Sequence, residues 1–144
     1  MDYDNAPIGI FDSGFGGLTV AREIIKALPE ESIIFYGDRA NCPYGPRDPE
    51  QVKQFVLRIC QWLIDRKVKM IVIACNTATA VVWEEIKESL DIPVLGVVLP
   101  GSSAAIKSSQ SGHIGVIGTP MTISSNIYEQ KIKHLAPQMN VLSL

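Results

Sequence analysis

Short apolar runs alternate along the chain with longer stretches in which apolar residues recur every three or four positions. The runs have the continuity of buried strands, and they lie at residues 8–11, 32–36, 70–73, 93–98, 114–117 and 141–144. The longer stretches have helical spacing, and they lie at residues 18–28, 52–64, 78–90, 102–109 and from Thr122 or Ser124 to about Leu135. This alternation predicts an α/β fold with a parallel sheet and helices on both of its faces.

The chain is organised around residues 70–78, where four apolar residues are followed by Ala74-Cys75-Asn76-Thr77. A buried strand here ends in a polar turn, and Asn76 and Thr77 are good N-cap residues for the helix that follows. Cys75 then lies beside a helix N-terminus, which lowers the pKa of a thiol. We expect Cys75 to be the most reactive cysteine, as a base or a nucleophile. The alternative is a small buried residue at a strand end, and the spacing alone leaves both open.

Polar residues also follow other predicted strands. Asp12 and Ser13 follow the first run, residues 43–45 lie in the long loop after the second, and Thr119 follows the fifth. In an open parallel sheet the loops after the strands share one edge, and ligands bind there. Folding alone does not require polar side chains in all these loops, so the pattern favours a functional Cys75.

Residues 12–17, Asp-Ser-Gly-Phe-Gly-Gly, form a glycine-rich turn between the first strand and the first helix. Glycines allow backbone N–H groups to approach an anion at a helix start. The pattern matches neither G-x-G-x-x-G nor the Walker A loop, and Asp12 would repel a phosphate. A zwitterion fits better, with its carboxylate on the amides and its ammonium on Asp12. A plain tight turn is the alternative.

The composition of the 144 residues, 47% hydrophobic and 19% charged, fits about one domain. The formal net charge of −2, without a basic cluster, argues against nucleic acid as the main ligand. Three cysteines at no framework spacing favour a reducing compartment over disulfides, and Cys and His show no metal-ligand spacing. No apolar run approaches membrane-spanning length, and residues 1–7 are too polar for a secretory signal. We therefore expect a cytoplasmic protein that does not bind a membrane.

Several motifs follow one another along the chain. They are Asp-Ser-Gly-Phe-Gly-Gly-Leu-Thr-Val at 12–20, Cys-Pro-Tyr-Gly-Pro-Arg at 42–47, Ala-Cys-Asn-Thr-Ala-Thr at 74–79, Gly-Val-Val at 96–98 with Pro-Gly at 100–101, and Ile-Gly-Thr at 117–119 with Thr-Ile at 122–123. In kind and order they closely resemble the motifs of the glutamate racemases, in the aspartate/glutamate racemase family. The resemblance spans essentially the whole chain. It implies two similar α/β domains that face each other across the active site.

The resemblance implies a cofactor-independent enzyme that interconverts L- and D-glutamate and supplies D-glutamate for peptidoglycan of the cell wall. Because the sequence has no cluster of metal ligands, we also expect the enzyme to need no metal. In that family one cysteine removes the α-proton as a thiolate, and a second cysteine delivers a proton to the opposite face. Cys75 matches the first cysteine, and Asp12 matches a catalytic aspartate near it and near the substrate amine. The matched substrate-binding positions are Asp12, Ser13, Pro43, Tyr44, Gly45, Asn76, Thr77, Thr119 and Thr122. Small-molecule glutamate is the implied partner, and a homodimer is the assembly we consider.

The sequence departs from the family at its second cysteine. That residue lies in a late Cys-Thr-His motif, which the sequence does not contain, and a mid-chain catalytic glutamate has no counterpart either. We therefore expect part of a longer protein. Residues 1–99 would be the first domain without its C-terminal completing segment, and residues 100–144 the beginning of the second, divided at a loop at 99–101. The 144-residue chain by itself is then expected to be inactive.

Two other functions stay open. The first is an aspartate or related amino-acid racemase, which a panel of substrates would separate from a glutamate racemase. The second is a non-catalytic module that binds amino acids or a protein partner, and the missing second base is its main support.

Overall fold

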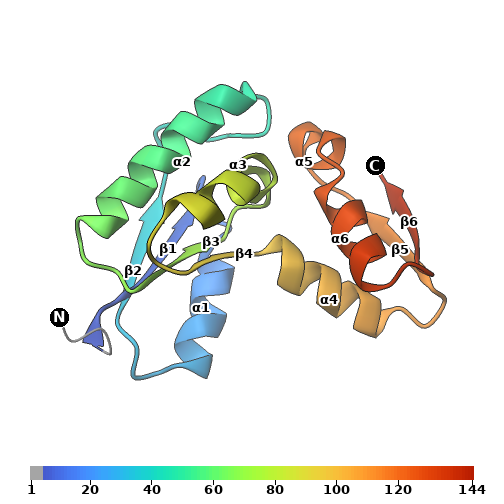
Figure 1. Cartoon of the computed structure of the whole chain (residues 1–144), viewed down its shortest axis with the longest axis horizontal. Coiled ribbons are helices and arrows are strands. Elements are labelled where there is room, and N and C mark those ends of the chain that lie inside the picture. Colours follow the sequence, from blue (N-terminus) through green and yellow to red (C-terminus); the bar gives the residue numbers. More distant parts are fainter. Residues whose placement is uncertain (1–4) are drawn as a thin grey trace.

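Each strand is separated from the next by one or two helices in the computed structural model, which describes residues 5–144 (Figure 1). Residues 1–4, part of the N-terminal stretch judged too polar for a secretory signal, lie outside the described residues. The strands are β1 (Ile8–Asp12), β2 (Ile33–Gly37), β3 (Met70–Ile73), β4 (Val94–Gly96), β5 (His113–Val116) and β6 (Asn140–Ser143). The helices are α1 (Leu18–Ala27), α2 (Pro49–Ile64), α3 (Asn76–Ser89), α4 (Val98–Ser108), α5 (Pro120–Ser124) and α6 (Ile127–Leu135). None of the described helices has the length and apolar character needed to cross a membrane.

The first lobe comprises β1 to β4 and α1 to α3, and it is built on a parallel sheet with the strand order β2-β1-β3-β4. β1 lies inside the sheet, and its Ile8 is paired with Ile33 on one side and with Met70 on the other. All five residues of β1 are buried, which explains why residues 8–11 form a continuous apolar run rather than an alternating one. The predicted α/β class with a parallel sheet is confirmed.

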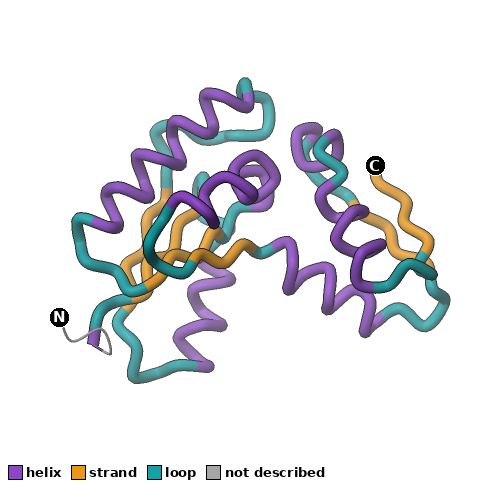
Figure 2. Tube along the Cα trace, in the orientation of Figure 1, coloured by secondary structure: helices purple, strands orange, loops and turns teal. Residues whose placement is uncertain are grey.

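Helices cover both faces of this sheet, as the sequence predicts (Figure 2). Side chains alternate along a strand, so neighbouring residues of β1 enter different cores. Phe11 and Ile73 pack into the core formed with α2 and α3. Ile10 and Val72 point to the opposite face, where they pack with Ala21 of α1. This sandwich fixes the ends of β1 and β3, from which the candidate catalytic residues project.

The second lobe consists of α4, α5, α6 and a two-stranded parallel sheet of β5 and β6. Ile114 of β5 is paired with Val141 of β6, and it packs with Ile132 and Ala136 in a small core of its own. In Figure 1 this lobe lies to the right of the first and is joined to it through β4 and α4.

The connection between the lobes differs from the sequence-based expectation. Residues 99–101 were expected in a loop, but they lie in the first turn of α4, which begins at Val98. Pro100 is tolerated there because the first N–H groups of a helix have no partner within the helix. The first hydrogen bond of the helical pattern in α4 is donated by the N–H of Gly101 to the carbonyl of Val97, at 3.1 Å. The expected loop is therefore wrong, while the division into domains at this point stays a prediction.

The helix expected from Thr122 or Ser124 to Leu135 is two helices, α5 and α6. The break falls at Asn126, whose φ of 55° lies in the left-handed region. α5 begins earlier than expected because Pro120 occupies its first turn and Thr119 caps it, with the Thr119 hydroxyl accepting from the Thr122 N–H at 3.3 Å. Thr119 and Thr122 are thereby held on the same side of a short helix.

Candidate functional site

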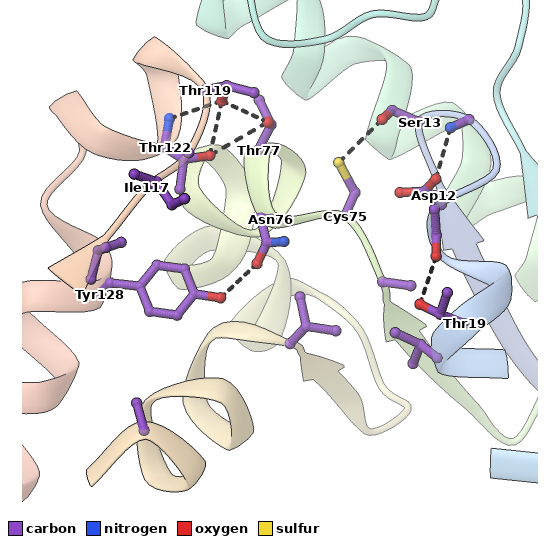
Figure 3. Close-up of a pocket in the computed structure, with 18 of the residues that line it drawn as sticks. Asp12, Ser13, Thr19, Cys75, Asn76, Thr77, Ile117, Thr119, Thr122 and Tyr128 are labelled. Atoms are coloured by element: carbon purple, nitrogen blue, oxygen red, sulfur yellow. Dashed lines mark hydrogen bonds between the residues drawn. The ribbon is translucent and has the colours of Figure 1, made fainter. Parts of the chain in front are cut away.

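A cavity of about 750 Å³ opens between the two lobes (Figure 3). It lies at the carboxyl ends of β1 and β3, where the strand order reverses because β2 and β3 flank β1 on opposite sides. The first lobe contributes residues 12–16 and 74–77 to its lining, and the second contributes residues 114–119, Thr122 and Tyr128. The sequence-based expectation that the strand-end polar residues meet is thus confirmed for Asp12, Ser13, Cys75 and Thr119.

Cys75 itself is the N-cap of α3, in place of the expected Asn76 or Thr77. Its backbone is extended, with φ −100° and ψ 120°, and its Sγ accepts from the N–H of Ala78 at 3.4 Å. On the other side the thiol donates to the Ser13 hydroxyl oxygen, with 3.4 Å between sulfur and oxygen. The sulfur is therefore held between the start of α3 and the turn that follows β1, as Figure 3 shows.

Burial raises the pKa of the Cys75 thiol above its ordinary value, because the residue is only 5% exposed. Hydrogen bonding with Ser13 and the hydrogen bond from the Ala78 N–H lower this pKa, and the negative charge of Asp12 raises it again. The expected lowering of the pKa is therefore wrong, since the loss of hydration outweighs the donors at the helix start. That Cys75 is the most reactive cysteine stays untested, and because Cys42 is exposed and lines the same cavity, we expect Cys42 to react before it.

Asp12 is held within the glycine-rich turn. It is 7% exposed, and its Oδ2 accepts from the N–H of Gly14 at 3.0 Å. This N–H, which we expected to face a bound carboxylate, is occupied by Asp12. Gly17 has a different role, because a Cβ there would lie 2.5 Å from the Asp12 Cβ and 2.9 Å from the Ala74 Cβ. A glycine at 17 thus lets the start of α1 pack against the ends of β1 and β3.

Three threonine hydroxyls meet on the other side of the cavity. The Thr77 oxygen lies 3.0 Å from that of Thr119 and 3.4 Å from that of Thr122, and the last two are 3.0 Å apart. Thr77 comes from α3, whereas the other two come from the second lobe. Because each hydroxyl has one proton and two lone pairs, all three can rotate to donate a hydrogen bond to an anion in the cavity.

The loop at 43–45 lies beside this cluster but outside the cavity lining. Tyr44 is 1% exposed, and its hydroxyl donates to Asp38 Oδ2 at 2.6 Å. Burial and this hydrogen bond raise the pKa of the Tyr44 phenol, which stays a donor. A Cβ on Gly45 would lie 3.0 Å from Thr119, so the loop reaches the second lobe at that point. Contact of Pro43, Tyr44 and Gly45 with substrate stays a prediction.

Two residues near the site were not identified as functional candidates from the sequence. Tyr128 of α6 lines the cavity, and its hydroxyl donates to Asn76 Oδ1 at 2.6 Å. It lies in an ordinary amphipathic stretch, so no sequence signal marks it. Asp38 is 4% exposed, and it accepts the hydrogen bond that orients Tyr44. It directly follows β2, so a search for polar residues after predicted strands, which selected Asp12, could also have found Asp38.

The charge of the cavity is set by Asp12 alone among the Asp, Glu, Lys and Arg residues of the described part of the chain. Its remaining polar groups are hydroxyls, an amide and thiols. Within residues 5–144, His, Cys, Asp and Glu side chains form no group of three or more that could hold a metal ion. The predicted independence of metals and cofactors stays a prediction.

A family model described as Asp/Glu/Hydantoin racemase matches residues 8–141. A glutamate racemase from Streptococcus thermophilus is 74% identical over 141 residues, which are 98% of this chain and 52% of the relative. The crystal structure of a glutamate racemase from Bacillus anthracis matches with a TM-score of 0.93 at 50% identity, over 96% of this chain and 52% of that one. One from Francisella tularensis, in complex with D-glutamate, matches with a TM-score of 0.88 at 41% identity, over 97% and 52%.

The chain spans about half the length of these relatives. The matches confirm the resemblance that the strand-end motifs carry, and the fold agrees with it over nearly all of the chain. The chain belongs to the Asp/Glu/Hydantoin racemase family.

Proposed function

We propose that the chain forms one side of a glutamate racemase active site, in which Cys75 exchanges a proton with the substrate α-carbon. The proposal is supported by relatives named glutamate racemase and by related structures that contain D-glutamate or L-glutamate. The observation that carries it is the position of the Cys75 thiol in the cavity, between the carboxylate of Asp12 and the three threonine hydroxyls.

The polar groups of the cavity suit the charges of glutamate. The ammonium group pairs with the carboxylate of Asp12, and a carboxylate accepts hydrogen bonds from the hydroxyls of Thr77, Thr119 and Thr122. The N-terminus of α3 adds a favourable dipole for negative charge. A site of this kind holds an acidic amino acid without Lys or Arg, and the cavity lining has neither among the described residues.

Proton removal requires the Cys75 thiolate. The sulfur takes the α-proton to form an S–H bond, and the electron pair of the C–H bond stays on the substrate as a carbanion. A thiol on the opposite face, from the late Cys-Thr-His motif of the family, then delivers a proton to that carbon and becomes a thiolate. The configuration is inverted without a pyridoxal or metal electron sink, so the surroundings must stabilise the charge.

Substrate binding favours the thiolate. Burial raises the pKa of Cys75, and the charge of Asp12 raises it further. An ammonium group bound to Asp12 offsets that charge, and its own positive charge stabilises the thiolate nearby. The Ser13 hydroxyl, which accepts from the thiol, reverses its role and donates to the thiolate.

The biological role that follows from the family is the supply of D-glutamate for peptidoglycan in the cytoplasm. The homodimer stays a prediction. The chain by itself should not racemise glutamate, because residues 1–144 contain no Cys-Thr-His motif to supply the second proton.

The proposal is tested by joining this chain to the part of the Streptococcus thermophilus relative that extends beyond the match. Circular dichroism follows the conversion of L-glutamate, D-glutamate and L-aspartate by this protein, its Cys75→Ala variant and a Cys60→Ala control. We expect racemisation of both glutamate enantiomers, its loss with Cys75→Ala, and its retention with the control. Racemisation by the Cys75→Ala variant would disprove the role of Cys75, and a preference for aspartate would assign another substrate.

A further inference from the structure

We propose that Tyr128 is a positioning residue that fixes the side-chain amide of Asn76 so that its N–H groups face the carboxylate of the substrate. This inference rests on the proposed function and extends it to a residue of the second lobe. The hydroxyl of Tyr128, in α6, donates to Oδ1 of Asn76, the first residue of α3, at 2.6 Å. Figure 3 shows this bond beside the threonine cluster, at the edge of the same cavity.

The polarity of an asparagine side chain explains why this bond matters. The amide has an oxygen that only accepts and a nitrogen that only donates, and a rotation of about 180° exchanges them. An exposed Asn76 without a partner could present either end to the cavity. Because Tyr128 donates to the oxygen, the nitrogen is left to donate elsewhere, and a carboxylate meets N–H groups instead of a second negative oxygen.

The position of Tyr128 is itself constrained by the second lobe. A Cβ on Gly101 of α4 would lie 3.3 Å from the Tyr128 hydroxyl oxygen, so the glycine leaves room for that oxygen. Burial raises the pKa of the phenol, which keeps its proton available for donation at neutral pH. One turn along α6, Lys131 reaches Glu84 of α3 at 3.6 Å, which provides a second contact between the same two helices.

Through this bond, the binding of the substrate carboxylate by Asn76 in the first lobe depends on the position of the second lobe. Asn76 belongs to the same turn as Cys75, and Tyr128 moves with α6 and the small core around Ile132. If α6 shifts away, the amide of Asn76 loses the contact that sets its direction. Glutamate affinity should then fall although no group that touches the substrate has been removed.

The test compares the 144-residue chain with Tyr128→Phe, Asn76→Ala, the double variant and a matched control, Tyr36→Phe. Tyr36 packs against Trp62, with ring centroids 5.0 Å apart, and is not among the cavity residues. The first measurement needs no ligand: the NMR resonances of the Asn76 side-chain NH₂ group. We expect them to shift and to become closer to those of a freely exposed amide in Tyr128→Phe, and to stay unchanged in Tyr36→Phe.

The second measurement is the affinity for D- and L-glutamate from NMR titration. We expect Tyr128→Phe to weaken binding roughly three- to tenfold, the range for loss of one hydrogen bond, and Tyr36→Phe to leave it unchanged. In the Asn76→Ala background, Tyr128→Phe should have no further effect, because Tyr128 acts through Asn76. Equal weakening in both backgrounds, or unchanged Asn76 resonances in Tyr128→Phe, would overturn the inference. If the unsubstituted chain binds no glutamate, this result counts against the proposed glutamate site, while the ligand-free resonances still decide whether Tyr128 orients Asn76.

Discussion

Replacement of Gly17 by alanine tests the packing that places Asp12 in the cavity. Gly17 has an ordinary helical conformation, with φ −63° and ψ −13°, so alanine is allowed by the backbone. The difficulty is space, because the new methyl group would lie 2.5 Å from the Asp12 Cβ and 2.9 Å from the Ala74 Cβ. Both neighbouring Cβ atoms belong to buried residues, in β1 and directly after β3, and a Cβ atom cannot rotate away from the backbone that carries it.

The expected magnitude is the difference between two effects. Overpacking of a well-filled site costs about 1–3 kcal/mol. A Gly→Ala change at a compatible φ stabilises by about 0.4–1 kcal/mol, since the unfolded chain loses conformational freedom. The clash here is severe, so Gly17→Ala should lower the free energy of unfolding by about 1–2 kcal/mol. The neighbouring Gly16 provides a matched control, because a Cβ there would lie 3.8 Å from its nearest neighbour, Asp12 Oδ2.

Urea unfolding followed by tryptophan fluorescence measures this difference. Trp62 and Trp83 lie in α2 and α3, so the signal reports the lobe that contains both glycines. We expect Gly16→Ala to be as stable as the unsubstituted chain or up to about 1 kcal/mol more stable. If Gly17→Ala equalled or exceeded Gly16→Ala in stability, the close packing of α1 against β1 and β3 would be incorrect.

Three further outcomes follow from the cysteines. Limiting iodoacetamide with peptide mapping should label the exposed Cys42 first, then Cys75, and the core residue Cys60 last; faster labelling of Cys75 would contradict the raised pKa. Burial raises the pKa of Cys60 to about 12 and also raises that of Cys75, so unfolding favours their deprotonation. The contribution of these thiols to the free energy of unfolding should be constant below pH of about 8.5. The free energy of unfolding should fall as the pH rises above this value, less steeply in Cys60→Ala, and a rise would contradict the raised pKa values. Finally, the 144-residue chain should leave the circular dichroism of L-glutamate unchanged, and a steady loss that Cys75→Ala abolishes would reveal a second proton-transfer group within it.

The sequence was sufficient to predict that Asp12, Ser13 and Cys75 meet at the cavity, because their proximity follows from topology. A parallel sheet brings the residues after β1 and β3 to one edge whatever the details of packing, so Asp12, Ser13 and Cys75 had to lie close together. The resemblance to the family added Thr122, whose contact with Thr77 across the lobes adjacent strands alone would not have revealed.

Properties that depend on tertiary packing could not be predicted in this way. The pKa of Cys75 follows from burial in the tertiary structure, whereas the sequence reveals only the nearby helix start. Pro100 and Gly101 are typical of a loop, yet the first turn of a helix accepts the proline, and the glycine makes room for Tyr128. The contact between Tyr128 and Asn76 joins residues 52 positions apart and has no local signature.

The central claim, that glutamate binds between the turn at Asp12 and the threonine hydroxyls, is tested most directly by an NMR titration of the ¹⁵N-labelled chain. D-glutamate and L-glutamate should shift the backbone resonances of residues 12–17, 75–77 and 119–122, which come from three separate segments around one cavity. Glutarate, which lacks the ammonium group, should bind more weakly because Asp12 then faces no positive charge. Shifts confined to residues outside the cavity, or equal binding of glutarate and glutamate, would contradict the account.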